Sequence, residues 1–127
     1  MDDIVTFKLP LPPTVNRMYI RVKRRVMLTR EAREYKWTVE RAMNEFKPPK
    51  FAPDSMIGFG MCVYPSNGRE ALRDVDNGVK IVLDGFQQAG LYANDRQVKE
   101  MHVKMMPIQR MNEGYIVVTF YSLDVEV

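Results

Sequence analysis

Two adjacent prolines divide this chain into a helical segment and a part richer in strands. Pro48 and Pro49 follow a stretch in which apolar side chains recur every three or four residues. Proline lacks a backbone N–H and fixes φ, so no helix continues through this point. With Thr29 as a favourable N-cap, the pattern predicts one helix that ends just before the prolines. Its apolar stripe consists of Ala32, Tyr35, Val39, Ala42, Met43 and Phe46.

Alternating apolar and polar residues predict strands on both sides of this helix. The first covers residues 4–9, and a second lies within residues 55–65. Two final strands, at residues 101–105 and 115–121, are expected around a turn at Gly114. These strands follow one another in groups and do not alternate regularly with helices.

A second helix is predicted from about Asp76, because Val79, Val82 and Phe86 recur at helical spacing. Gly90 is suited to end it in a left-handed conformation. Two helices among directly consecutive strands indicate an α+β fold of two layers, with both helices on one face of a mixed sheet. The 127 residues are expected to form one domain.

The composition narrows the classes of function. Nineteen Lys and Arg against sixteen Asp and Glu give a formal charge of +3, which mildly favours an anionic partner. One cysteine and one histidine exclude an internal disulfide, a zinc finger and the multi-histidine zinc or HNH-type nuclease centres. No apolar run is long enough to span a membrane, and the acidic start is no secretory signal, so a cytoplasmic location is expected.

The stretch RDVDNGVK, residues 73–80, places two carboxylates two residues apart. Such like charges repel unless a cation neutralises them, and hard divalent ions such as Mg²⁺ prefer oxygen ligands. If the backbone is extended here, both side chains point to the same side. We therefore predict that Asp74 and Asp76 bind a metal. The alternative is an N-cap aspartate beside a surface aspartate.

A third carboxylate and a lysine accompany this pair. Asp95 follows the second helix after a short turn, where it is either a third metal ligand or an ordinary turn residue. Lys80 lies in the first turn of the predicted helix. It either places its charge against a substrate or pairs with Asp76 or Asp84 at i, i+4 spacing.

A basic segment lies earlier in the chain. Five positive residues occur within nine positions, with apolar residues between them. An acidic partner fits such a segment, and the alternative is a solvated charged hairpin. The five residues are Arg17, Arg21, Lys23, Arg24 and Arg25.

Several stretches together resemble the RusA family of Holliday junction resolvases, the crossover junction endodeoxyribonucleases of bacteria and their phages. The acidic core is similar to that of the family, and so are the Pro-Pro segment near the N-terminus and the start of the first helix. The resemblance therefore spans most of the chain. The stretches are RDVDNGVKIVLDGFQQAG, LYANDRQV, LPPTVNRMY and LTREAREYKWTV.

The resemblance implies a catalytic centre. Asp74, Asp76 and Asp95 would be catalytic carboxylates that bind Mg²⁺, which Mn²⁺ can replace, and Lys80 the essential lysine beside them. Asp84 also matches a family position. Asn94 departs from the pattern, since a relative has an acid there, and this puts any fourth carboxylate in doubt. The chemistry expected is metal-assisted hydrolysis of a phosphodiester bond.

The resemblance also implies partners. The substrate would be branched DNA with four arms, in recombination and repair, and a C2 homodimer would supply the two sites needed for paired cuts. The chain would be encoded by a bacterium, a phage or a prophage. DNA phosphates would be contacted by Arg17, Arg21, Lys23, Arg24, Arg25 and Arg73.

Two other classes of function compete with this interpretation. A non-catalytic DNA-binding or phage assembly protein could carry the same acids as helix caps. A nucleotide-sugar transferase also uses a D-x-D motif, but it needs a nucleotide-binding domain that 127 residues hardly provide.

Overall fold

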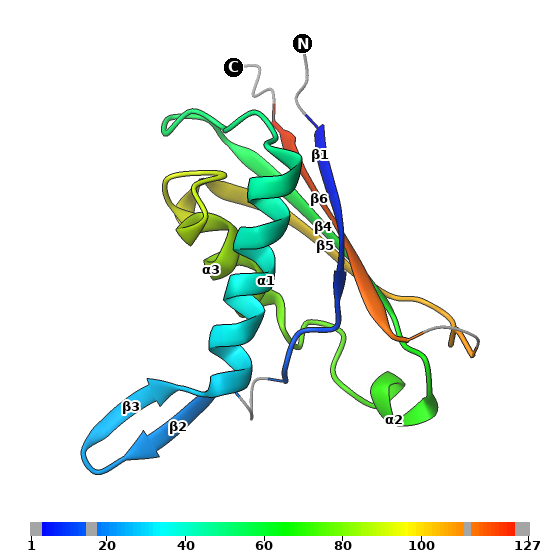
Figure 1. Ribbon diagram of the computed structural model, residues 1–127. Coiled ribbons are helices and arrows are strands. Elements are labelled where there is room, and N and C mark those ends of the chain that lie inside the picture. Colours follow the sequence, from blue (N-terminus) through cyan, green and yellow to red (C-terminus); the bar gives the residue numbers. More distant parts are fainter. Residues whose placement is uncertain (1–3, 15–17, 111–112, 124–127) are drawn as a thin grey trace.

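The centre of the fold is a four-stranded sheet with two helices on one side of it (Figure 1). The computed structural model describes residues 4–14, 18–110 and 113–123. This arrangement confirms the predicted α+β class. The sheet contains β1 (Ile4–Pro10), β4 (Ile57–Tyr64), β5 (Val98–Met105) and β6 (Tyr115–Ser122). The remaining elements are a hairpin of β2 (Tyr19–Val22) and β3 (Arg25–Leu28), the helices α1 (Arg30–Phe46), α2 (Gly68–Ala71) and α3 (Val79–Gln88), and the 3₁₀ helix η2 (Asp95–Gln97).

The strand order is β1-β6-β4-β5, and the last two strands of the chain are therefore not neighbours. β6 pairs antiparallel with both β1 and β4, whereas β5 runs parallel to β4. A parallel pair needs a long crossover, which the segment containing α3 supplies. The expectation that the final strands meet around Gly114 is wrong in this respect, because alternation identifies a strand without identifying its partner.

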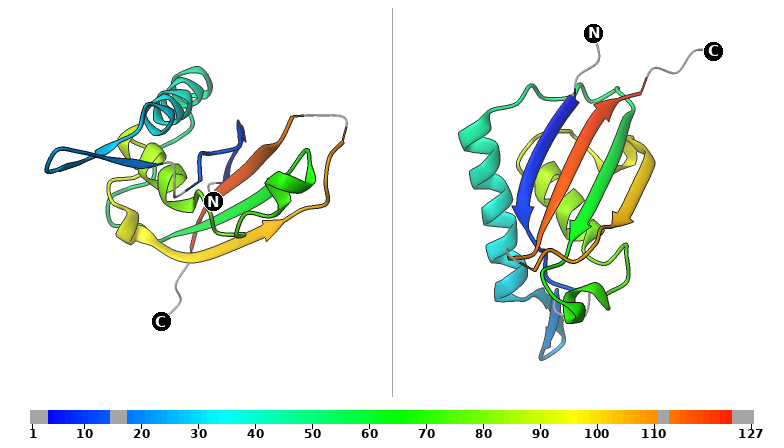
Figure 2. Two further views of the ribbon diagram at one scale, coloured as in Figure 1. Left: turned by 90° about the horizontal axis from the view of Figure 1, so that it is seen from below. Right: turned by 90° about the vertical axis from the view of Figure 1, so that its right-hand side faces the viewer.

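The core lies between the sheet and the two long helices. Figure 2 shows α1 and α3 behind the sheet in its right-hand view. Phe86 of α3 forms ring contacts with Phe7 and Phe120, at centroid distances of 5.1 and 4.9 Å. Phe59 adds a contact with Phe120 at 5.1 Å. Phe86 thus fixes α3 against β1 and β6, on which Phe7 and Phe120 lie, and Phe59 of β4 joins the cluster through Phe120.

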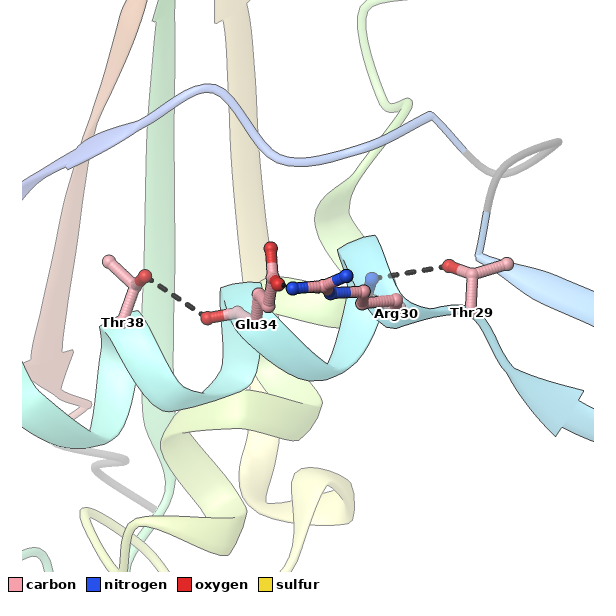
Figure 3. A network of polar contacts seen from close by, with 5 residues as sticks. Thr29, Arg30, Glu34 and Thr38 are labelled. Atoms are coloured by element: carbon pink, nitrogen blue, oxygen red, sulfur yellow. Dashed lines mark hydrogen bonds and ion pairs between the residues drawn. The ribbon is translucent and has the colours of Figure 1, made fainter.

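Both ends of α1 confirm the sequence-based prediction. The Thr29 hydroxyl accepts a hydrogen bond from the N–H of Ala32 at 3.2 Å, and the helix ends at Phe46, before the two prolines. Figure 3 shows this N-terminus, where Arg30 also pairs with Glu34 at 2.8 Å. The predicted stripe is buried except for Ala42, which is half-buried, and Phe46, which is 62% exposed.

The helix α3 begins at Val79 and not near Asp76, as the sequence suggested. The backbone instead turns twice, because the N–H of Asn77 donates to the carbonyl of Asp74 and that of Val79 to Asp76. Gly78 then has a φ of 95°, a left-handed conformation that suits glycine. A Cβ at Gly78 would overlap the ring of Pro12. The glycine is therefore required by the turn and by this close contact.

Two further details concern loops and termini of helices. Ser66 and Asn67 lead into the short helix α2, which Asn67 caps by accepting from the N–H of Glu70. Gly90 ends α3 with a φ of 89°, as predicted. Within the described ranges, no helix has the length and apolar character needed to cross a membrane.

Replacing Gly78 by alanine tests the turn before α3. We expect Gly78→Ala to lower the free energy of unfolding by about 1–3 kcal/mol, because it combines a left-handed non-glycine residue with overlap against Pro12. Urea denaturation measures this change. Gly68→Ala is the matched control, since no atom of the described residues lies within 4 Å of its added Cβ. Equal stability of the two variants would contradict the assigned role of Gly78.

Candidate active site

The acidic pair lies in the turn that leads into α3. Asp74 and Asp76 are both exposed, and their backbone carbonyls are used in the two turns described above. The extended backbone considered for this segment is therefore not what the structure has. No hydrogen bond or ion pair to either carboxylate occurs within the described part of the chain, so both groups are open to a ligand.

The turn is held by the segment that follows β1. Arg73 donates a hydrogen bond from Nη1 to the carbonyl of Pro12 at 3.0 Å, and Pro12 also lies against Gly78. The hydroxyl of Tyr35, on α1, donates to the carbonyl of Pro10 at 2.7 Å. The last residue of β1 is thus tied to α1, and the loop that follows is tied to the turn of residues 73–78.

Arg73 is half-buried in this arrangement. Burial lowers the pKa of its guanidinium, which the nearby Glu70 carboxylate and Tyr35 partly offset. Burial likewise raises the pKa of Tyr35 well above its usual range, and Arg73 opposes that rise. The Nε of Arg73 is buried without a partner among the described residues. One nitrogen of Arg73 therefore supports the loop, while its predicted contact with DNA stays a prediction.

Asp95 is the first residue of η2, close to the other end of α3. Its N–H donates to Oε1 of Gln87, in the last turn of α3, at 2.9 Å. Asn94 caps η2 by accepting from the N–H of Arg96 at 2.8 Å. Burial raises the pKa of Tyr92 above its usual range, and the negative charges of Asp95 and Asp84 raise it further. Asp95 is exposed, like the acidic pair.

The three predicted metal ligands are not gathered within one chain. Asp74 and Asp76 precede the first residue of α3, whereas Asp95 is bonded to its last turn. The ten residues of α3 span ~15 Å at the usual helical rise. Ligands of one ion lie much closer than this, since each is ~2 Å from a Mg²⁺ ion. Accordingly, no group of three or more metal-binding side chains occurs in the described ranges.

Lys80 lies in the first turn of α3, directly after the acidic turn, and is exposed. In the described ranges the ion pairs are Arg30 with Glu34, and His102 with Glu100 when the imidazole is protonated. The considered pairing of Lys80 with Asp76 or Asp84 is therefore not seen. Its ammonium remains available to a bound anion.

The basic segment forms the hairpin β2–β3, which extends away from the rest of the fold (Figure 1). Arg21, Lys23, Arg24 and Arg25 are exposed, and Lys23 has a φ of 57° at the tip. Arg17 lies outside the described residues. The hairpin is thus a projecting arm with at least four positive charges.

Comparison with known proteins identifies the class of this chain. The family model for endodeoxyribonuclease RusA matches residues 10–119. This range includes the hairpin, the stretch 73–80 with its acidic pair, and Asp95. Relatives named crossover junction endodeoxyribonuclease RusA are 28% identical in Escherichia coli (strain K12) and Shigella sonnei (strain Ss046), and 29% identical in Enterobacteria phage 82. Each comparison runs over 111 residues and covers 80% of this chain and 82% of the relative.

A match over most of the chain makes this protein an endodeoxyribonuclease, an enzyme that hydrolyses phosphodiester bonds in DNA. The chain belongs to the RusA family of crossover junction endodeoxyribonucleases. This confirms the family resemblance of the sequence and the enzyme class that the resemblance implied.

Sequence reasoning missed the residues that hold the acidic segments in place. Gln87 and Gln97 both accept hydrogen bonds from the loop around Asp95. For Gln97 a signal was present: Asn94 followed three residues later by a glutamine has the spacing of a capping box, which the structure contains. Gln87 and Tyr35 carry no comparable local signal, because their partners are distant in the sequence or belong to a loop.

The substitution Lys80→Met tests whether Lys80 contacts the substrate or is only a surface lysine. If the ammonium lies against the scissile phosphate, the variant should fold normally and slow single-turnover cleavage by about 10²-fold or more. Lys104→Met is the control, because Lys104 is exposed on β5, opposite Cys62 and on the sheet face away from the helices. A Lys80→Met rate within about threefold of wild type would make this lysine structural.

The exposed charges of the hairpin predict that DNA affinity depends on salt concentration. Replacing Arg24 and Arg25 with alanine should weaken binding to DNA of every shape and flatten the dependence of affinity on salt by up to about one unit of slope per lost phosphate contact. Fluorescence anisotropy at several salt concentrations measures the slope. Replacing Lys8 and Lys104 with alanine is the control, because both lysines are exposed on the sheet face away from the helices. This double variant should retain the wild-type slope. An unchanged slope in the Arg24 and Arg25 variant would indicate a merely solvated hairpin.

Proposed function

We propose that this chain is a Mg²⁺-dependent nuclease that resolves four-way DNA junctions by paired cuts, as a homodimer. The observation that carries the proposal is the exposed pair Asp74 and Asp76 just before α3, in a member of a nuclease family. Beside it lies Lys80, which forms no ion pair with another described residue. Carboxylates and a lysine in this order supply the two things that phosphodiester hydrolysis needs, a metal site and a positive charge beside the phosphate.

The donor chemistry fits a divalent ion. Asp74 and Asp76 provide carboxylate oxygens that no residue of the described chain engages, and hard cations such as Mg²⁺ or Mn²⁺ prefer such ligands. When bound, the ion would activate water and stabilise the leaving 3′ oxygen. Among the described residues no side chain caps the N-terminal end of α3, so its first backbone N–H groups add positive potential beside the acids. Lys80 would stabilise charge on the scissile phosphate.

A second copy of the chain would complete the metal site. The third carboxylate, Asp95, lies beyond the far end of α3 and cannot join Asp74 and Asp76 in the same chain without breaking that helix. In a C2 dimer every contact between two different residues of the two copies occurs twice, with the copies exchanged. Asp95 of each copy can therefore face Asp74 and Asp76 of the other. Two equivalent sites then arise, as two matching cuts require.

The basic hairpin would bind the DNA backbone. Arg21, Lys23, Arg24 and Arg25 are exposed on an arm that projects from the fold, and phosphate contacts by such residues provide affinity without sequence selectivity. In a dimer the two arms would lie on opposite sides of a symmetry axis, which suits a substrate with related arms. Arg73, next to Asp74, would contact DNA near the cut.

Cleavage of a synthetic four-way junction tests the proposal. We expect paired nicks with Mg²⁺ and none with EDTA. Asp76→Asn should abolish the nicks while junction binding stays intact or becomes tighter, because a negative charge near phosphate is removed. Glu45→Gln, which removes one exposed charge near the end of α1, should cut like wild type.

Two results would contradict the proposal. Cleavage by Asp76→Asn near the wild-type rate would remove the acidic pair from the site. Binding without cleavage under all metal conditions would instead favour a non-catalytic DNA-binding or phage assembly protein.

A further inference from the structure

Gln97 is a buried polar residue whose entire amide is used in hydrogen bonds. The residue is 7% exposed, and apart from tyrosines no other polar or charged residue of the described ranges is buried. Oε1 accepts from the N–H groups of Ala93 and Asn94, at 2.9 and 3.0 Å. Nε2 donates to the carbonyls of Ala52 and Ser55, at 2.8 and 3.0 Å. A glutamine amide has two donors and an oxygen with two lone pairs, so its capacity is filled.

These bonds join two loops that are distant in the sequence. One loop, residues 52–55, precedes β4, and the other, residues 93–94, leads directly into Asp95. Because four bonds radiate from one planar group, neither loop can shift without losing a buried hydrogen bond. Gln97 therefore fixes the chain immediately before Asp95 relative to the start of β4.

A second contact fixes Asp95 from the other side. Its N–H is bonded to Oε1 of Gln87 on α3, while the N–H of Gln97 donates to the carbonyl of Asn94 at 3.0 Å. The backbone of Asp95 is thus held between α3 and the Gln97 amide. Its carboxylate is exposed and forms no hydrogen bond or ion pair within the described ranges. The whole arrangement restrains the backbone and leaves the side chain for a ligand.

We propose that Gln97 is a positioning residue that orients Asp95 for divalent-metal binding. The inference rests on the proposed function, in which Asp95 is a metal ligand. Residues that orient ligands in this way typically change metal affinity by 10–100-fold when they are replaced, although they do not touch the ion. Gln97 would act through the backbone of residues 93–95, since its amide oxygen and nitrogen are both engaged there and at residues 52–55.

The test compares two substitutions of different chemistry. Gln97→Met keeps the shape of the side chain and removes all four bonds. Gln97→Glu keeps the oxygen that accepts from Ala93 and Asn94 but replaces the donor to Ala52 and Ser55 with an acceptor oxygen. Val118→Ala, a fully buried position on β6, serves as the control for a general loss of stability.

Three readouts are needed. Calorimetric titration of the DNA-free protein with Mn²⁺ measures metal affinity, cleavage against Mg²⁺ concentration measures the metal requirement, and hydrogen exchange of the metal-free protein measures order at residues 93–97. We expect Gln97→Met to weaken Mn²⁺ binding and raise the Mg²⁺ requirement by about tenfold or more, with faster exchange at residues 93–97. Junction binding in EDTA should be unchanged. Gln97→Glu should likewise speed exchange at residues 93–97, because its second oxygen repels the carbonyls of Ala52 and Ser55. Val118→Ala should alter neither metal readout.

The outcomes separate this inference from the proposed function. Wild-type protein that neither binds Mn²⁺ nor cuts, or an Asp95→Asn variant as active as wild type, would overturn the metal role of Asp95 and both proposals with it. Suppose that wild type cuts and Asp95→Asn does not. If Gln97→Met then binds Mn²⁺ as tightly as wild type, only the positioning role of Gln97 is overturned. An equal shift in Val118→Ala, or failure of both Gln97 variants to fold, would also overturn it, because the amide would then serve folding in general.

Discussion

The packing of α3 in the core determines the geometry of the candidate site. Phe86 anchors the helix to Phe7 and Phe120, and Gly85 allows α1 to approach so closely that Val39 lies 3.3 Å from a Cβ built at that glycine. A helix held this way cannot bend to bring its two ends together. The acidic turn at one end and Asp95 at the other therefore keep a fixed separation, and the functional chemistry has to accommodate it.

Much of the fold follows from the sequence because its signals are local. The Thr29 cap, the stop at Pro48 and the alternation in β1 are decided by neighbouring residues, and the structure has all three. The partner of β5 and the start of α3 were not predictable in this way. The first depends on a crossover to β4, and the second on a contact between Gly78 and Pro12, which lie far apart in the sequence.

For the candidate site, the residues could be predicted from the sequence but their arrangement could not. Asp74, Asp76, Asp95 and Lys80 were selected from residue type and spacing, and all four are exposed. Their arrangement could not be selected that way, because it depends on where α3 begins and on what holds each loop. A sequence in which three acids lie within 22 positions suggests one cluster, whereas the intervening helix keeps them apart. This separation makes the second copy of the chain a chemical requirement of the proposed mechanism.

Mixing two inactive variants tests whether each metal site is shared between two copies of the chain. Asp76→Asn and Asp95→Asn proteins, each inactive alone, would be unfolded and refolded together and then given a four-way junction with Mg²⁺. If each site takes Asp76 from one copy and Asp95 from its partner, a mixed dimer has one site with both substitutions and one fully wild-type site. We predict that the mixture recovers cleavage, as single nicks in place of paired cuts. No recovery, with mixed dimers verified by mass after one variant has been labelled with ¹⁵N, would show that each site is built from one chain and would contradict the shared metal site.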